Sequence, residues 1–200
     1  FDKLMPEETE KLLRSIMTEE QKNYLDENGE VDFSFAIPAL GRFRANVFKQ
    51  RGSYAAAFRI VLTEVADEEE LGLPREVTDL SMLKRGLVLV TGPAGSGRTT
   101  TLAALIDKIN SYREVHVITL EEPIEYLHQH KKAIVNQREI GIDAESYPKA
   151  LRAALRENPD VIMIGGMRDS ETVRLALTAA EAGHLVLSTL HTVGAGNRTD

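Results

Sequence analysis

The sequence predicts an α/β protein in which a core with a parallel β-sheet follows a small, partial α+β domain. Three observations support this fold class. From Gly86 onward, short apolar runs alternate with segments of helical periodicity, as in chains of βαβ units. A glycine-rich turn at residues 92–99 joins one of these runs to a helical segment. Before residue 62, apolar and polar residues alternate with a period of two, which is typical of antiparallel strands that bury one face.

Composition and charge limit the function classes. The chain has 200 residues, a formal net charge of −7 and no cysteine. The negative charge argues against a nucleic-acid partner, which would need a positive surface to replace counterions. Without cysteine, neither a disulfide framework nor cysteine-ligated zinc is available within these residues. No apolar run is long enough to span a bilayer.

The N-terminal part is expected to combine two helices with three strands. Helical spacing of apolar residues predicts a first helix that begins near Pro6, and Gly29 is expected to end a second, shorter helix. The alternating pattern predicts strands at residues 31–37, 43–47 and 54–61. The arginines in and beside these strands, taken alone, are interpreted as a solvated sheet face. These arginines are Arg42, Arg44, Arg51 and Arg59.

An acidic stretch with Gly72 and Pro74 follows the third strand and indicates a linker that contains one short helical turn. We therefore expect a partial N-terminal domain at residues 1–64, the linker at 65–80 and the core at 81–200. The sequence begins with Phe1, and no finishing element precedes Asp200. We interpret the core as truncated, without its C-terminal part.

Within the core, strands are expected at residues 87–90, 115–120, 161–164 and 185–190, and helices at 97–110, 150–157 and 171–182. This alternation implies parallel strands joined by right-handed crossovers. Ligands of such sheets bind beyond the carboxyl ends of the strands. The motifs described next all lie at such ends, so we expect them to share one site.

The glycine-rich turn matches the phosphate-binding pattern G-x-x-x-x-G-K-S/T except at the lysine, where Arg98 stands. Its backbone N–H groups and the start of the following helix provide positive potential for a nucleotide phosphate. Thr99 is placed to bind Mg²⁺ through its hydroxyl. Arginine keeps the charge of lysine but is longer, planar and forked. The candidate nucleotide-binding residues are Gly92, Gly95, Ser96, Gly97, Arg98, Thr99 and Thr100.

Further segments extend this match, in order, along nearly the whole chain. They are GRFRANVF, GPAGSGRTTTLAALID, ITLEEPIEYLH, VNQREIG and ALRAALRENPDVIMIGGMRDSETVRLALTAAEAGHLVLSTLHT. With these segments the chain resembles the type II/IV secretion ATPase superfamily, and within it the type IV pilus retraction ATPases of the twitching-motility PilT family. The NQRE segment and the run from Met167 to Asp169 are more similar to the retraction branch than to the assembly branch.

The resemblance implies a RecA-like core after a PAS-like N-terminal domain. It also implies an ATP hydrolase that uses Mg²⁺ to drive pilus retraction. The full-length family member is expected to be a homo-hexamer in the cytoplasm, at the inner face of the cytoplasmic membrane. Its implied partner there is an inner-membrane pilus platform protein, with peripheral membrane association only and no nucleic acid.

The resemblance also assigns roles to four side chains. Glu125 matches the carboxylate of the acidic box that orders Mg²⁺, directly or through water, and the attacking water. His191 matches the histidine box and could respond to the γ-phosphate, whereas His184 is interpreted as structural. Arg42, Arg44 and Arg59 match N-terminal arginines, some of which reach nucleotide in the family hexamer in the manner of arginine fingers. The match favours this role more for Arg59 than for Arg44, and Arg42 and Arg59 are the candidate site residues.

Two positions depart from the family pattern: Arg98 replaces the lysine, and Gly166 replaces a glutamate that polarises water. Loss of a positioned general base typically costs on the order of 10²–10⁴ in rate. One alternative is therefore a hydrolysis-deficient nucleotide-binding paralogue or subunit, and another is that both residues are changes to an ordinary retraction ATPase. A pilus-assembly or type II secretion ATPase, which shares the same boxes, is a further alternative.

Overall fold

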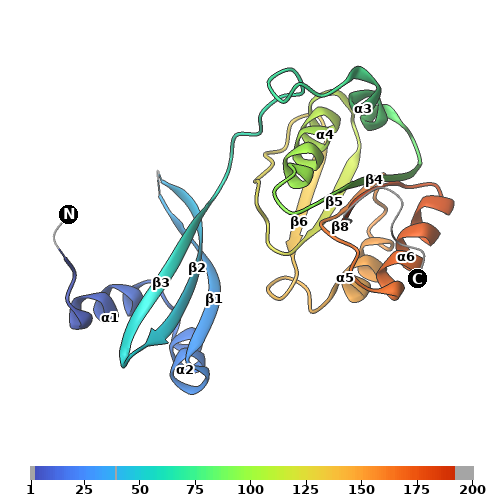
Figure 1. Ribbon diagram of the computed structural model, residues 1–200. Helices are drawn as coiled ribbons and strands as arrows, with labels where there is room; N and C mark the ends of the chain where they lie inside the picture. The colour runs from blue at the N-terminus through green and yellow to red at the C-terminus, as the bar shows by residue number, and fades with distance from the viewer. Residues whose placement is uncertain (1–2, 39, 192–200) are drawn as a thin grey trace. The chain divides into compact units, whose positions relative to one another are not determined.

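The structure is a computed structural model that describes residues 3–38 and 40–191. The chain divides into two units, Phe1–Leu62 and Thr63–Asp200, and each is described by itself (Figure 1). The first unit combines helices with an antiparallel sheet, and the second is α/β with a parallel sheet. The predicted fold class is therefore confirmed.

The first unit packs two helices against a three-stranded sheet with the strand order β1-β2-β3. Its elements are α1 (Pro6–Ser15), α2 (Glu19–Asn28), β1 (Glu30–Ile37), β2 (Gly41–Gln50) and β3 (Ser53–Val61). Thr18 caps α2 by accepting a hydrogen bond from the backbone N–H of Gln21. Gly29 ends this helix in a left-handed conformation, with φ of 83°.

The period of two in the strands separates an apolar face from a polar face. Val31 lies opposite Val47, and Phe33 lies opposite Ala45. All four are buried together with Leu25 of α2. The intervening residues, including Arg42, Arg44 and Arg59, therefore lie on the other face of the sheet. Arg51, which was expected on the same face, lies in the turn between β2 and β3.

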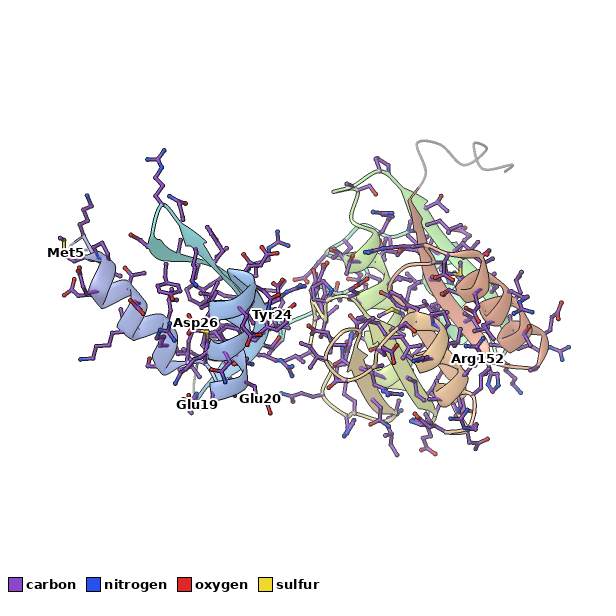
Figure 2. All side chains as sticks on the ribbon, turned by 90° about the horizontal axis from the view of Figure 1, so that it is seen from below. Met5, Glu19, Glu20, Tyr24, Asp26 and Arg152 are labelled. Carbon is purple, nitrogen blue, oxygen red and sulfur yellow. The ribbon has the colours of Figure 1, made fainter. Side chains whose placement is uncertain are left out.

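A polar cluster connects α1, α2 and β3. Arg14 Nη2 donates hydrogen bonds to Asp26 Oδ1 at 2.8 Å and to Tyr54 Oη at 2.9 Å. Tyr54 Oη in turn donates to Asp26 Oδ1 at 3.0 Å, and Figure 2 labels Asp26. Hydrogen bonds from Arg14 and Tyr54 lower the pKa of Asp26 because they stabilise its ionised form.

The second unit contains a five-stranded parallel sheet with the order β4-β8-β7-β5-β6. Its helical elements are α3 (Arg75–Asp79), the 3₁₀ turn η1 (Leu80–Met82), α4 (Arg98–Tyr112), α5 (Tyr147–Ala154) and α6 (Ser170–Glu181). Its strands are β4 (Gly86–Gly92), β5 (His116–Glu121), β6 (Ile134–Glu139), β7 (Val161–Ile164) and β8 (Leu185–His191).

Helices cover both faces of this sheet (Figure 1). On one face, Ile106 of α4 packs in a cluster with Val161 of β7. On the other face, Leu151 of α5 and Ala176 of α6 pack in a cluster with Ile162 of the same strand. Because both faces are covered, the inner strands are continuous apolar runs, as the sequence predicts. Within the described residues, no helix is both long and apolar enough to cross a membrane.

The structure contains one strand that the sequence did not predict, and one helix begins and ends earlier than predicted. The missed strand, β6, ends in Asn-Gln-Arg-Glu and lies at the edge of the sheet, so it has no continuous apolar run. Helix α5 was predicted at residues 150–157, but it begins three residues earlier at Tyr147. Ser146 caps it by accepting from the backbone N–H of Lys149, and Pro148 occupies its first turn.

Candidate nucleotide-binding site

The glycine-rich loop lies at the carboxyl end of β4 and leads directly into α4, as predicted. Gly97 precedes the first helical residue with φ of 85°, a left-handed conformation that favours glycine. A Cβ atom on Gly92 would lie 2.6 Å from Ser96 Oγ, so the loop folds back closely on itself. The loop, which includes Gly95, therefore lies at the N terminus of a 15-residue helix, where a phosphate is favoured.

The first turn of α4 contains Arg98, Thr99 and Thr100, all partly buried. Arg98 Nη1 donates a hydrogen bond to the backbone carbonyl of Leu190 at 3.0 Å, near the end of β8. The guanidinium therefore contacts β8. A lysine ammonium, which is shorter and not planar, would reproduce this contact poorly. Thr100 Oγ1 lies 3.2 Å from Tyr126 Oη, in the loop that follows β5.

The parallel register brings the carboxyl ends of four strands to the same end of the sheet. Gly92 of β4 lies opposite His191 of β8, and Ile164 of β7 lies opposite Ser188 of β8 and Leu120 of β5. Neighbouring strands are about 4.8 Å apart, so the end of β5 is about 14 Å from the end of β4. The loop after β5 must therefore extend toward the phosphate loop if the two are to share a site.

The acidic loop, residues 122–133, makes this approach. Tyr126 contacts Thr100 in the first turn of α4, and the neighbouring residue Glu125 is exposed. Because Thr100 follows Thr99 directly, this contact holds the loop that carries Glu125 beside the first turn of α4. The acidic box and the phosphate loop thus lie at the same end of the sheet.

Glu121 ends β5 and is buried, with 4% of its surface exposed. Its Oε1 accepts hydrogen bonds from Thr119 Oγ1 at 2.6 Å and from Gln137 Nε2 at 3.0 Å. Burial raises the pKa of Glu121 to about 7 in spite of these hydrogen bonds, and the nearby carboxylate of Glu125 raises it further. A carboxyl group that titrates near neutrality is a common feature of functional sites.

The turn after β7 contains two glycines that differ in their surroundings. The backbone N–H of Gly165 donates to Leu120 O at 2.7 Å, and a Cβ there would have three neighbours at 3.3 Å. A Cβ on Gly166 would lie 3.8 Å from Thr189 Oγ1 and 4.0 Å from Arg168 Nε, which are ordinary contacts. Gly166 has no side chain and so supplies no carboxylate, although these distances leave room for a Cβ atom at this position.

The two histidines of the histidine box lie at opposite ends of β8. The backbone of His191 pairs with Gly92, but its side chain lies outside the described part of the structure, so its role stays a prediction. His184 immediately precedes β8, and its Nδ1 donates to the carbonyl of Pro159 at 2.7 Å. This hydrogen bond fits the structural interpretation of His184.

The predicted arginines lie in the first unit, on the polar face of its sheet. Arg59 of β3 is exposed and lies directly opposite Arg44 of β2, with Arg42 two residues away from Arg44. Asp32 Oδ1 is 3.7 Å from Arg44 Nη2, whereas Arg59 makes no ion pair among the described residues. Like charges directly opposite one another repel. This face therefore carries excess positive charge beside a hollow of about 290 Å³.

The oxygen donors present fit Mg²⁺ held together with a nucleotide phosphate. Within the described residues, no group of three or more His, Asp or Glu side chains is arranged to hold a metal ion. Mg²⁺ usually binds through one or two protein oxygens, with phosphate oxygens and water completing its shell. The Thr99 hydroxyl and the Glu125 carboxylate are donors of this kind.

Sequence reasoning missed two residues that organise the acidic loop. Tyr126 links the loop to α4, and Gln137 links it to Glu121 and to the edge strand β6. Gln137 belongs to the NQRE segment, which was interpreted as a marker of the retraction branch. Its alternation with Glu139 along an extended segment was the available signal that both side chains share one face.

Comparisons with known proteins place these features in a family. The family model described as "Type II/IV secretion system protein" matches residues 59–198. The "Type IV pilus retractation ATPase PilT" of Pseudomonas aeruginosa is 50% identical over 189 residues, which cover 94% of this chain and 55% of that protein. A "Twitching motility protein" of Neisseria gonorrhoeae is 49% identical over 194 residues, which cover 97% of this chain and 52% of that protein.

Solved structures agree with this placement. A crystal structure of the pilus retraction motor PilT with bound ADP superposes with a TM-score of 0.91 and 58% identity, over 95% of this chain and 55% of that chain. The chain spans about half the length of the relatives that it matches. These similarities confirm the predicted resemblance to the pilus retraction ATPases. Because the family model matches most of its length, the chain belongs to the type II/IV secretion system protein family.

Proposed function

We propose that this chain is the nucleotide-binding part of an ATPase that retracts type IV pili in twitching motility. The observation that carries the proposal is the contact between Tyr126 and Thr100, which holds the acidic loop beside the phosphate loop. The similarity to a pilus retraction motor solved with ADP supports a nucleotide as the ligand. The similarity to proteins named for pilus retraction and twitching supports the process.

In this proposal, the backbone of residues 92–97 and the N terminus of α4 hold the phosphates of ATP. Thr99 and Glu125 hold Mg²⁺, directly or through water, and Mg²⁺ neutralises charge that develops on the phosphate oxygens. Glu125 also orients the water that attacks the γ-phosphate. His191 responds to the presence of that phosphate.

The arginines of the first unit complete the proposed site. Arg59 lacks an ion-pair partner in the described residues. Arg44, which lies opposite it, pairs with the carboxylate of Asp32. A polyphosphate would relieve this repulsion, so Arg59 and Arg42 are suited to contact nucleotide from a neighbouring subunit. We propose a cytoplasmic homo-hexamer at the inner face of the membrane, peripherally associated with an inner-membrane pilus platform protein.

A second candidate is a subunit that binds nucleotide with little or no hydrolysis. Gly166 offers no carboxylate where the family pattern has a glutamate, and the Arg98 guanidinium bonds to the carbonyl of Leu190. Phosphate binding through backbone N–H groups does not require either side chain. Nucleotide binding is therefore common to both candidates, and hydrolysis distinguishes the first from the second.

The two candidates separate in one experiment on the complete protein. Binding of a fluorescent ATP analogue with Mg²⁺ is titrated, and phosphate release is measured under the same conditions. Binding with turnover supports the retraction ATPase, and tight binding without turnover supports the second candidate. Absence of binding in the presence of Mg²⁺ would contradict both.

A further inference from the structure

The side-chain amide of Gln137 connects the edge strand β6 to the acidic loop. Its Nε2 donates hydrogen bonds to Glu121 Oε1 at 3.0 Å and to the backbone carbonyl of Tyr126 at 2.8 Å. Its Oε1 accepts from the backbone N–H of His128 at 2.8 Å. An uncharged amide provides two donors and an acceptor in this arrangement, which neither a carboxylate nor an apolar side chain can do.

The side chains of β6 alternate between the acidic loop and the opposite side. Glu139, two residues beyond Gln137, is buried, and its Oε2 accepts from the backbone N–H of Ile124 at 3.3 Å. Asn136 lies on the other side of the strand, is exposed and donates to His116 Nε2 at 2.9 Å. One row of β6 side chains therefore holds the loop, while the neighbouring amide of Asn136 bonds to His116 instead.

The hydrogen bonds form a continuous path between the two parts of the site. Tyr126 is held at its carbonyl by Gln137 and at its hydroxyl by Thr100 of α4. The path runs from the first turn of α4, through Tyr126 and Gln137, to Glu121 at the end of β5. Glu125 lies between Ile124 and Tyr126, and both of these neighbours are fixed by hydrogen bonds.

We propose that Gln137 is a positioning residue for the reaction. It fixes the acidic loop so that Glu125 is held toward the nucleotide, and through Tyr126 it couples this loop to the first turn of α4. The proposal rests on the proposed function, because Glu125 acts only on a nucleotide in the phosphate loop. Among the described residues, Gln137 forms hydrogen bonds with Glu121, Tyr126 and His128 and none with the phosphate loop or α4, so its loss is expected to lower turnover rather than nucleotide affinity.

The test compares Gln137→Met, which keeps the side-chain length but removes its hydrogen bonds, with Asn136→Ala as the matched control in the complete protein. Amide hydrogen exchange is measured without nucleotide, and kcat, KM and the Kd for ADP are measured with Mg²⁺. We expect the His128 amide to exchange at least about tenfold faster in Gln137→Met, because a removed partner exposes this N–H. We expect kcat to fall by about 10–100-fold, with Kd changed less than about threefold.

Tyr126→Phe provides a second variant, since it removes a single hydroxyl at the other end of the path. It is expected to lower kcat in the same direction, and the double variant should be no slower than the slower single variant by more than about twofold, because residues on one path are not additive. Independent, additive effects would overturn the proposed coupling. If Gln137→Met failed to fold, Tyr126→Phe alone would decide: an unchanged kcat would overturn the proposal.

Equal exchange rates and equal kcat values in Gln137→Met and Asn136→Ala would also overturn the proposal. So would a raised Kd with an unchanged kcat. Failure of the proposed function gives a different result, namely wild-type protein that binds no nucleotide. The exchange measurement needs neither nucleotide nor turnover, so it decides in that case whether Gln137 holds the loop.

Discussion

His128 lies in the acidic loop with its imidazole buried against α4, and replacing it with phenylalanine should change how stability depends on pH. Its side chain is 2% exposed, Asp107 Oδ1 is 3.9 Å from Nδ1, and Nδ1 has no hydrogen-bond partner among the described residues. Burial lowers the pKa of His128 to about 4, although Asp107 raises it; Lys131 lowers it further. The imidazole is therefore neutral in the folded protein at neutral pH.

The size of the effect follows from the difference between the folded and unfolded states. As the pH falls from 6.5 to 4.5, the unfolded chain takes up a proton at His128, with an ordinary pKa of 6.5, and the folded chain does not. Each pKa unit corresponds to about 1.4 kcal/mol. The contribution of His128 to the unfolding free energy is therefore about 2 kcal/mol higher at pH 6.5 than at pH 4.5.

Glu121 acts with the opposite sign over the same range. Its pKa is raised from 4.5 to about 7, so between these values the folded chain keeps a proton that the unfolded chain has lost. Its contribution to stability therefore falls by about 2 kcal/mol from pH 4.5 to pH 6.5. The two contributions nearly cancel, so neither should be visible in the pH dependence of the unfolding free energy of the wild-type protein.

Single substitutions should uncover each contribution. Urea unfolding followed by circular dichroism at pH 4.5, 5.5 and 6.5 gives the difference in unfolding free energy between variant and wild type. From pH 4.5 to 6.5, this difference should fall by about 2 kcal/mol for His128→Phe and rise by about 2 kcal/mol for Glu121→Gln. It should be nearly flat for the double variant. A difference constant within about 0.5 kcal/mol for His128→Phe would refute a buried, neutral imidazole.

Three further predictions concern the nucleotide site. Gly166→Glu combined with Arg98→Lys is expected to raise ATP turnover by about 10²–10⁴, because it restores a candidate base and a compact charge; no gain in phosphate release would contradict our account of both positions. Thr99→Ala should weaken nucleotide binding about tenfold with Mg²⁺ and leave it unchanged with excess EDTA, as measured by fluorescence titration. Arg59→Ala should lower kcat of the assembled protein about tenfold or more, whereas Arg51→Ala, in the β2–β3 turn, should leave it unchanged.

The elements that the sequence predicted well depend on local pattern. The glycines of residues 92–97, the apolar runs of the inner strands and the alternation in the first unit each reflect a constraint that acts on neighbouring residues. The missed features depend on partners far away in the sequence. Arg98 bonds to a carbonyl 92 residues later, and Gln137 reaches residues 9 to 16 positions earlier. The raised pKa of Glu121 depends on burial, which two adjacent glutamates do not reveal.

The surroundings of Gly166 separate the fold of this site from its chemistry. A Cβ at this position would make only ordinary van der Waals contacts, so packing does not require glycine here. The absence of a carboxylate is therefore not explained by the stability of the turn. Arg98 is likewise accommodated by the carbonyl of Leu190. Both departures leave the phosphate loop and the carboxyl ends of the strands intact, so under the proposed function turnover can change without a change in nucleotide affinity. Position 166 supplies no carboxylate, so under the proposed function hydrolysis depends more heavily on Glu125, and therefore on the hydrogen bonds from Gln137 and Tyr126 that hold its loop.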